Sequence, residues 1–256
     1  MTNNPLVTII TVVFNGEKYL QQTIDSVYNQ TYKNIEYIII DGNSTDNTLA
    51  IIKKNNNKIT KWISEPDKGL YDAMNKGIKM ATGVLVGTIN SDDWYELDAV
   101  ELSVNAYLKH KNAKIIHADR FDVQPDNSKQ VYKFNPSTFK FKYFSMTFSH
   151  PTMFVVREEY KNHFYNTKLK TFSDYQFILE VFLQDKNAFV YIQKPTVNFR
   201  LGGISSQLSF FEELKEAYLA RKMAGMKVHK RLFALSLKFI LNPVVQIKRT
   251  FNKKLK

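Results

Sequence analysis

Short apolar runs alternate with segments of helical periodicity through the first half of the chain. Five runs rich in Ile, Val and Leu predict strands at 6–13, 35–40, 59–63, 84–89 and 114–117. Between them, apolar residues recur every three or four positions and predict helices, at Leu20, Ile24 and Val27, at Leu70, Met74, Ile78 and Ala81, and at Leu97, Val100, Val104 and Leu108. Strands that alternate with helices indicate βαβ units. We therefore predict an α/β fold with a Rossmann-like, mostly parallel central sheet flanked by helices.

The pattern changes after Phe121. An aromatic-rich stretch covers 132–148, and later patterns predict a strand at 153–156, a helix at 174–183 and strands within 188–199. From about Phe210 the periodicity is helical to the end. We predict one domain over residues 1–208, with halves at 1–122 and 123–208, and a C-terminal helical extension over 209–256.

The composition is that of a folded globular protein, with 44% hydrophobic and 23% charged residues among 256. The absence of cysteine excludes disulfides and Cys-ligated zinc. Residues 1–5 lack the basic and apolar segments of a signal peptide, and the strand that follows is too short to span a bilayer. These features predict a cytoplasmic protein.

The formal net charge of +12 is unevenly distributed, since much of the excess lies in residues 227–256 while acidic motifs occupy the first hundred. We therefore expect a basic tail rather than a nucleic-acid partner. Segment 231–256 interleaves cations with apolar residues, and Lys238 and Pro243 interrupt it. This pattern suits a helix that lies on the inner face of the cell membrane better than one that spans it. The alternative is an ordinary helix packed on the domain.

The sharpest local feature is the acidic motif Asn90-Ser91-Asp92-Asp93-Trp94, directly after the predicted strand 84–89. Carboxylates at the carboxyl end of a parallel strand can hold Mg²⁺ or Mn²⁺ beside a diphosphate. The alternative is a helix N-cap. Asp41 ends the strand 35–40, so both acidic sites are expected along the same sheet edge.

A third motif, residues 65–77, is a loop that leads into a helix, with Asp72 and Asn75 one turn apart. In their order along the chain, these motifs make residues 5–122 resemble the nucleotide-sugar half of family 2 glycosyltransferases, which have a GT-A fold. The resemblance rests on four segments: residues 7–16, 41–46, 67–77 and 90–93.

The resemblance implies inverting transfer of a sugar from a nucleotide-diphosphate donor, by default a UDP-sugar. It also implies a saccharide or lipid-linked saccharide acceptor, bacterial cell-surface polysaccharide or glycolipid synthesis, and a divalent Mn²⁺ or Mg²⁺ cofactor. By the same resemblance Asp93 ligates the metal and Asp92 contacts the donor. The other donor-binding residues implied are Asp41 at the nucleotide base, Thr11 and Asn15 in the same pocket, and Lys68 and Asp72 near the donor.

The second half is expected to supply the acceptor site and a catalytic base. Asp174, within residues 172–177, lies in a segment that resembles the one carrying the family's catalytic carboxylate. An inverting transfer needs a group that takes the acceptor proton, and a carboxylate can do so. Relatives often have an acid pair here, whereas this chain has Ser173 before Asp174. A helix N-cap is again the alternative.

Two further residues are candidates for substrate contact. His150 precedes a predicted strand where similar enzymes place a histidine near the substrates, although a lone histidine can equally be structural. Arg200, followed by residues 202–206, resembles a late family loop that closes over the diphosphate. Arginine suits bidentate recognition of phosphate.

Three other functions were weighed. A dinucleotide-dependent oxidoreductase is excluded, because residues 14–17 contain no G-x-G-x-x-G turn after the first strand. A sugar nucleotidyltransferase would also use a metal and a nucleotide and stays the enzymatic alternative, although such enzymes normally carry a Gly-rich basic loop near their start and none is present here. A non-catalytic basic module that binds membrane or nucleic acid, with the acids acting only as caps, stays open at this point.

Overall fold

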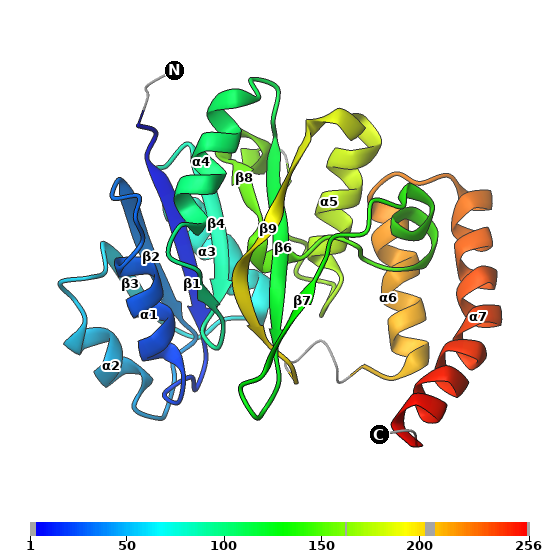
Figure 1. Cartoon of the computed structure of the whole chain (residues 1–256), viewed down its shortest axis with the longest axis horizontal. Helices are drawn as coiled ribbons and strands as arrows, with labels where there is room; N and C mark the ends of the chain where they lie inside the picture. Colours follow the sequence, from blue (N-terminus) through cyan, green and yellow to red (C-terminus); the bar gives the residue numbers. More distant parts are fainter. Residues whose placement is uncertain (1–3, 162, 203–207, 255–256) are drawn as a thin grey trace.

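The computed structural model describes residues 4–161, 163–202 and 208–254, with side chains described as far as Leu241. Figure 1 shows a central sheet covered by helices on both faces, with α6 and α7 packed beyond one end. The sheet has nine strands in the order β3-β2-β1-β4-β8-β6-β9-β5, and β7 pairs with β6. The predicted α/β fold is confirmed.

The first four strands are parallel and lie within two residues of the predicted runs: β1 (Val7–Val13), β2 (Ile35–Asp41), β3 (Lys61–Ser64) and β4 (Leu85–Asn90). The helices between and after them are α1 (Leu20–Tyr28), α2 (Thr48–Lys54), α3 (Leu70–Met80) and α4 (Ala99–Lys109). The inclusion of Leu97 in the last of these helices was wrong. Leu97 precedes α4 and is 63% exposed, because the chain first makes a short strand, β5 (Trp94–Tyr95).

The second half of the sheet is mixed. Strand β8 (Phe154–Val156) runs antiparallel between β4 and β6 (Ile115–Val123), and β6 pairs in parallel with β9 (Phe189–Arg200). Strand β6 is much longer than the predicted 114–117, and β5 and β7 (Lys129–Tyr132) were not predicted. The remaining elements are α5 (Ser173–Gln184), α6 (Phe210–Met223), α7 (Val228–Lys254) and the short helical turns η1 (Lys140–Phe144), η2 (His150–Thr152), η3 (Arg157–Lys161) and η4 (Lys186–Ala188).

Two hydrophobic clusters, one on each face of the sheet, hold the helices. Alternate residues of β1 point to opposite faces, as the period of a strand requires. Ile10 packs with the apolar residues of α3 and α5, whereas Ile9 packs with those of α1 and α4. A Cβ atom on Gly77 of α3 would lie 2.5 Å from an Ile10 methyl carbon, so glycine lets this helix approach β1 closely.

Candidate active site

The carboxyl ends of β1, β2 and β4 meet at one edge of the sheet. Val13 pairs with Asp41 of β2, and Val12 pairs with Asn90 of β4, so the acidic motifs of both strands flank the end of β1. Neighbouring strands are about 4.8 Å apart, which places the two motifs roughly 10 Å from each other. The prediction that Asp41 and the Asp92-Asp93 pair emerge along one edge is confirmed.

Asn15 ties the loops that follow β1 and β2. It adopts a positive φ of 50°, its backbone N–H donates to Ser44 Oγ at 2.8 Å, and its side-chain oxygen accepts the Thr45 N–H at 2.9 Å. Asparagine tolerates this left-handed conformation better than most residues. Asn15 therefore lies at the predicted edge and shapes both loops there.

Asp41 is fully buried at the end of β2. Its carboxylate accepts from the Ser44 hydroxyl at 2.5 Å and from the Ser64 hydroxyl at 2.6 Å. Each hydroxyl has one hydrogen to donate and two lone pairs to accept, so these bonds fix the carboxylate in place and the serine oxygens can still accept from a bound group. Asp41 lies at the predicted edge.

Phe14 was missed by the sequence reasoning. Its side chain is 63% exposed, although it follows a fully buried strand. A Cβ atom on Gly42 would lie 3.4 Å from the Phe14 ring and 2.5 Å from a carboxylate oxygen of Asp67. The glycine therefore keeps open the space between them. An exposed aromatic ring directly after a buried strand, at the edge where ligands bind, is a usable sequence signal.

Thr11 does not join this group. It is fully buried, and its hydroxyl lies 3.0 Å from the Tyr37 hydroxyl inside the core. The expectation that Thr11 lines the nucleotide pocket therefore needs correction. Thr11 lies two residues before the end of β1, where its neighbours are side chains rather than an open edge.

The two acids of the pair have different surroundings. Asp93 is 1% exposed, and its carboxylate accepts the Arg200 backbone N–H at 2.9 Å and the Asn90 amide at 3.1 Å. Asp92 is only partly buried. Burial raises the pKa of both carboxyl groups, the Asp92 charge raises the pKa of Asp93 further, and the Arg200 cation opposes the shift at Asp92. Two close carboxylates that resist joint ionisation form a site that favours a cation.

The N-cap alternative for this motif is wrong. The acids are followed by strand β5, and the next helix, α4, begins only at Ala99. Among the described residues, no group of three or more His, Asp or Glu side chains could hold a metal. The oxygens available are those of Asp92, Asp93 and Asn90. Mg²⁺ is typically bound by one or two carboxylates plus water and substrate phosphates, so this hard-oxygen set fits it.

Arg200, the last residue of β9, lies beside the acid pair. Its guanidinium lies 4.1 Å from the Tyr19 ring centre and 4.6 Å from that of Trp94, and it donates to the Gln22 side chain at 2.6 Å. Aromatic faces on a cation hold it in one orientation. The edge thus combines two carboxylates with a fixed cation. Of the predicted loop at 202–206, residues 203–206 lie outside the described residues.

The turn before α3 holds Lys68 and Asp72. Gly69 adopts a φ of 109°, a conformation that favours glycine, and the Asp72 carboxylate accepts the Lys68 backbone N–H at 3.0 Å. Asp72 therefore has a structural role at the start of the helix, while the Lys68 side chain is exposed. Asn75 points elsewhere and exchanges two hydrogen bonds with the Tyr165 backbone, at 2.8 and 3.0 Å.

Asp174 lies in the first turn of α5 and touches α3. Its carboxylate accepts the Tyr71 hydroxyl at 3.0 Å and the Tyr175 N–H at 2.8 Å. The N-cap alternative is wrong here too, because α5 begins one residue earlier, at Ser173. Burial and the Asp174 charge raise the pKa of Tyr71 well above its usual value, so the phenol stays protonated as the donor. Tyr71 was missed by the sequence reasoning.

His150 lies near the same carboxylate. Its Nε2 atom is 2.8 Å from the Tyr165 hydroxyl, and the Tyr165 and Tyr71 ring centres are 5.5 Å apart. Burial lowers the pKa of His150, and the Asp174 charge acts in the opposite direction. His150 therefore joins Tyr71, Tyr165 and Asp174 in an acceptor-side cluster, and the one hydrogen bond of its side chain among the described residues is to Tyr165.

Known proteins resemble this chain in sequence and in structure. The model of glycosyl transferase family 2 matches residues 8–164, more than half of the chain. The chain belongs to glycosyl transferase family 2. It is 31% identical over 216 residues to the chondroitin synthase of Pasteurella multocida, a match that covers 83% of this chain and 22% of that relative. The chain thus spans about a fifth of the length of that family member.

Solved structures agree on the fold. The chain resembles S. aureus TarS 1-349 in complex with UDP-GlcNAc, with a TM-score of 0.71 and 19% identity, over 91% of this chain and 71% of that one. It also resembles the Mycobacterium tuberculosis glucosyl-3-phosphoglycerate synthase in complex with Mn²⁺, UDP and its product. That match has a TM-score of 0.61 and 13% identity, and covers 87% and 81% of the two chains. The predicted GT-A fold and glycosyltransferase class are confirmed.

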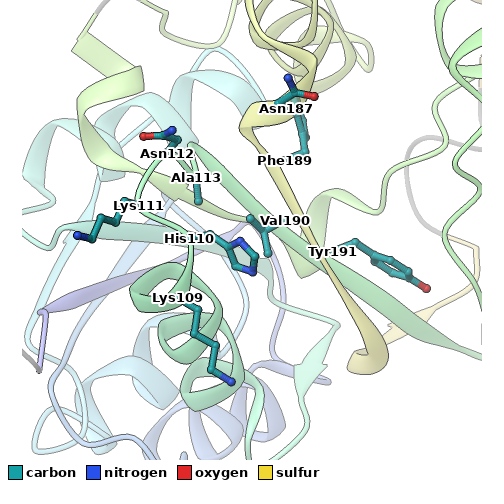
Figure 2. A pocket seen from close by; sticks show the side chains of 9 residues that line it. All are labelled: Lys109, His110, Lys111, Asn112, Ala113, Asn187, Phe189, Val190 and Tyr191. Atoms are coloured by element: carbon teal, nitrogen blue, oxygen red, sulfur yellow. The ribbon is translucent and has the colours of Figure 1, made fainter.

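The candidate site in this family 2 chain is distinct from the hollow in Figure 2. That hollow, of about 540 Å³, is lined by residues around the end of α4 and the start of β9, including Lys109, His110 and Tyr191. Strands β6 and β4 run in the same direction, since each is antiparallel to β8. The starts of β6 and β9 therefore lie at the opposite end of the sheet from the acid pair.

Proposed function

We propose that this chain transfers a sugar, with inversion, from a UDP-sugar to a hydroxyl group of a saccharide acceptor. The observation that carries the proposal is the placement of the Asp92-Asp93 pair beside Arg200 at one sheet edge of a family 2 fold. Further support comes from relatives, since the resembling S. aureus TarS structure holds UDP-GlcNAc and a related chain is a chondroitin synthase.

On the donor side, we assign the nucleotide base to the space between Phe14 and Asp41, and the diphosphate to the acid pair and Arg200. An aromatic face can stack on a base, and a carboxylate can accept its N–H groups. Arg200 supplies a bidentate donor to phosphate oxygens. Asn15, Lys68 and Asp72 shape the loops on either side of this path.

The acid pair would hold a divalent Mn²⁺ or Mg²⁺ ion. When bound, this cation offsets the negative charge that develops on the departing diphosphate. Asp93 is the residue that the family resemblance assigns to the metal, but both its oxygens already accept protein hydrogen bonds. The greater exposure of Asp92 favours it as the first contact, with Asp93 holding the strand end behind it. The two single variants distinguish these roles.

On the acceptor side, Asp174 takes the proton of the attacking hydroxyl. The acceptor oxygen then forms a bond to the anomeric carbon as the bond from that carbon to the diphosphate oxygen breaks. The Tyr71 hydroxyl orients the Asp174 carboxylate so that one oxygen stays available to the acceptor. This division of labour follows the two halves, 1–122 for the donor and 123–208 for the acceptor, except at two residues: Arg200 of the second half is assigned to the diphosphate, and Tyr71 of the first half orients the base.

We further propose that the acceptor is a saccharide or a lipid-linked saccharide, extended at the cytoplasmic face of a membrane during polysaccharide or glycolipid synthesis. No helix in the described part of the chain is long and apolar enough to cross a bilayer. The proposed contact with the membrane is peripheral, through the 209–256 extension.

A screen of nucleotide-sugars with Mn²⁺ or Mg²⁺ tests the proposal. Binding of the donor raises the melting temperature in proportion to its affinity, and UDP-sugars should do so only with the metal. Donors that raise it are then incubated with oligosaccharides, and the products and the released UDP are measured. Stabilisation by no nucleotide-sugar in the presence of either metal would contradict the donor assignment.

A further inference from the structure

Helix α7 buries two of its cations against α6 and exposes a row of apolar residues on its other side. Arg231 and Lys238 are 8% and 6% exposed, whereas a surface helix usually buries its apolar face. The Lys238 amino group pairs with Glu213 of α6 at 2.5 Å, and the Arg231 guanidinium lies 5.1 Å from the Tyr218 ring centre. The opposite side of the helix carries an apolar face formed by Val228, Leu232, Phe233, Phe239 and Ile240, which are 47 to 67% exposed.

The spacing of these residues makes the face continuous. Leu232 lies four positions after Val228, and Phe239 lies seven positions after Leu232, so these three residues share one side of the helix. Phe233 and Ile240 are also seven positions apart and lie next to them on the helix surface. The only other residues on this side between 228 and 240 are His229 and Ser236, so no residue with a permanent charge interrupts it.

Neighbouring elements extend the apolar face. The ring centres of Phe239 and Phe210, a residue of α6, are 6.1 Å apart. The Phe210 ring also packs near that of Phe211, which is 72% exposed. At the other end, the Phe233 ring lies 6.3 Å from Phe139 and 5.4 Å from Tyr143, at the η1 turn. Large exposed apolar patches of this kind mark binding surfaces.

The charge around this face points to an anionic partner. Residues 227–256 contain no Asp or Glu and nine Lys and Arg residues, seven of them besides the buried Arg231 and Lys238. Lys222 and Lys227, just before α7, are exposed. A second copy of the chain would bring two such cationic segments together, which is unfavourable. An anionic bilayer instead attracts each nearby cation by about 1 kcal/mol and accepts apolar side chains below its headgroups.

We propose that the apolar face of α7 docks the protein on an anionic lipid bilayer, with the helix lying in the membrane plane. Figure 1 shows α7 as the outermost element, running toward the side of the molecule to which the β1 arrow points. The docking proposal deepens the proposed function, because it suggests that the acceptor is held in the membrane. Only that suggestion rests on the proposed function; the docking itself is independent of it.

Co-sedimentation with vesicles tests this. The full chain should bind vesicles of phosphatidylcholine that contain 30% phosphatidylglycerol. Its affinity for vesicles of pure phosphatidylcholine should be at least tenfold lower. Replacing two exposed residues in Leu232→Glu/Phe239→Glu should reduce binding at least tenfold without changing the melting temperature. Leu97→Glu, an equally exposed apolar residue far along the chain, is the matched control and should bind normally.

Three outcomes would overturn the docking proposal. One is no binding of the unaltered chain to anionic vesicles. The second is binding that Leu232→Glu/Phe239→Glu leaves intact. The third is self-association in the absence of lipid, measured by sedimentation velocity, that this variant abolishes. Donor binding and transfer to a soluble acceptor, measured in parallel, test the proposed function separately, since the variant should retain both.

Discussion

The donor side and the acceptor side of the candidate site hold their carboxylates in different ways. Asp41 and Asp93 each accept a hydrogen bond from a residue three positions away, Ser44 and Asn90, and each also accepts one from farther along the chain, from Ser64 and from the Arg200 main chain. The side-chain partner of Asp174 is Tyr71, 103 residues away in the chain. A polar contact within a motif leaves a pattern in the sequence, whereas a contact between distant helices leaves none. The donor side is thus shaped partly within its own motifs, whereas the acceptor side depends on the contact between α3 and α5.

The largest expected effect comes from Asp174→Asn. Loss of a positioned general base costs on the order of 10³-fold in turnover, and Asn keeps the size of the side chain and its bond to Tyr71. Binding of UDP-sugar with Mn²⁺, followed by thermal shift, should stay unchanged, because the donor contacts lie on the other side. Transfer at the normal rate by this variant would move the base to another residue.

Substitutions in the acid pair sharpen the donor side of the comparison. We expect Asp92→Asn to weaken metal-dependent donor binding by roughly 100-fold, since removal of a metal contact costs at least as much as loss of a supporting residue. Titration of Mn²⁺ at fixed UDP-sugar measures this. Asp93→Asn keeps one acceptor oxygen for the Arg200 amide and should weaken binding less. The reverse order of the two variants would return the metal to Asp93.

A buried histidine in β6 tests the aromatic packing around that strand. His117 is 2% exposed among Phe134, Phe148 and Tyr191, and burial lowers its pKa to about 3. In the unfolded chain the histidine takes up a proton near pH 6.5, so the free energy of unfolding falls as pH falls below that value. Between pH 7 and pH 5 the loss is about 2 kcal/mol.

His117→Phe should remove that acid-dependent loss, which urea unfolding at pH 7 and pH 5 would measure. His110, exposed on the loop after α4, is the matched control, and His110→Asn should leave the pH dependence as it is. An unchanged slope in His117→Phe would mean that the ring is protonated in the folded protein.

The smallest expected effects are those of two tyrosine variants, Tyr71→Phe and then Tyr165→Phe. The first removes one hydrogen bond to Asp174 and keeps the ring, so turnover should fall about fivefold, in line with a net bond of about 1 kcal/mol. The donor concentration at half-maximal rate should not change. Tyr165→Phe, which loses a bond to His150 instead, should affect turnover less. Equal losses in both would show that the cluster acts as packing alone.

The predictability of the fold follows the same division. Strands β1 to β4 were located within two residues, because buried parallel strands read as unbroken apolar runs. Strands β5 and β7 were missed, since each is short and lies where only a neighbouring strand gives it a partner. The sequence placed the acidic residues of the motifs at the correct edge of the sheet. It wrongly placed Thr11 in the nucleotide pocket, because a buried and an exposed threonine cannot be told apart in a sequence. Phe14, Tyr71 and Tyr165 were overlooked because aromatic residues are usually read as core.

The pair of bonds between the Asn75 side chain and the Tyr165 main chain has one more consequence. These two bonds connect α3, in the first half, to the segment that precedes Asp174. The parallel pairing of β6 with β9 is a second connection between the two halves. The distance between the site of the leaving group and the base is therefore fixed before either substrate binds. This reduces the entropic cost of bringing the reacting groups into position. Neither half would then survive as an independent fragment, and any cut near residue 122 should yield two insoluble pieces rather than two working modules.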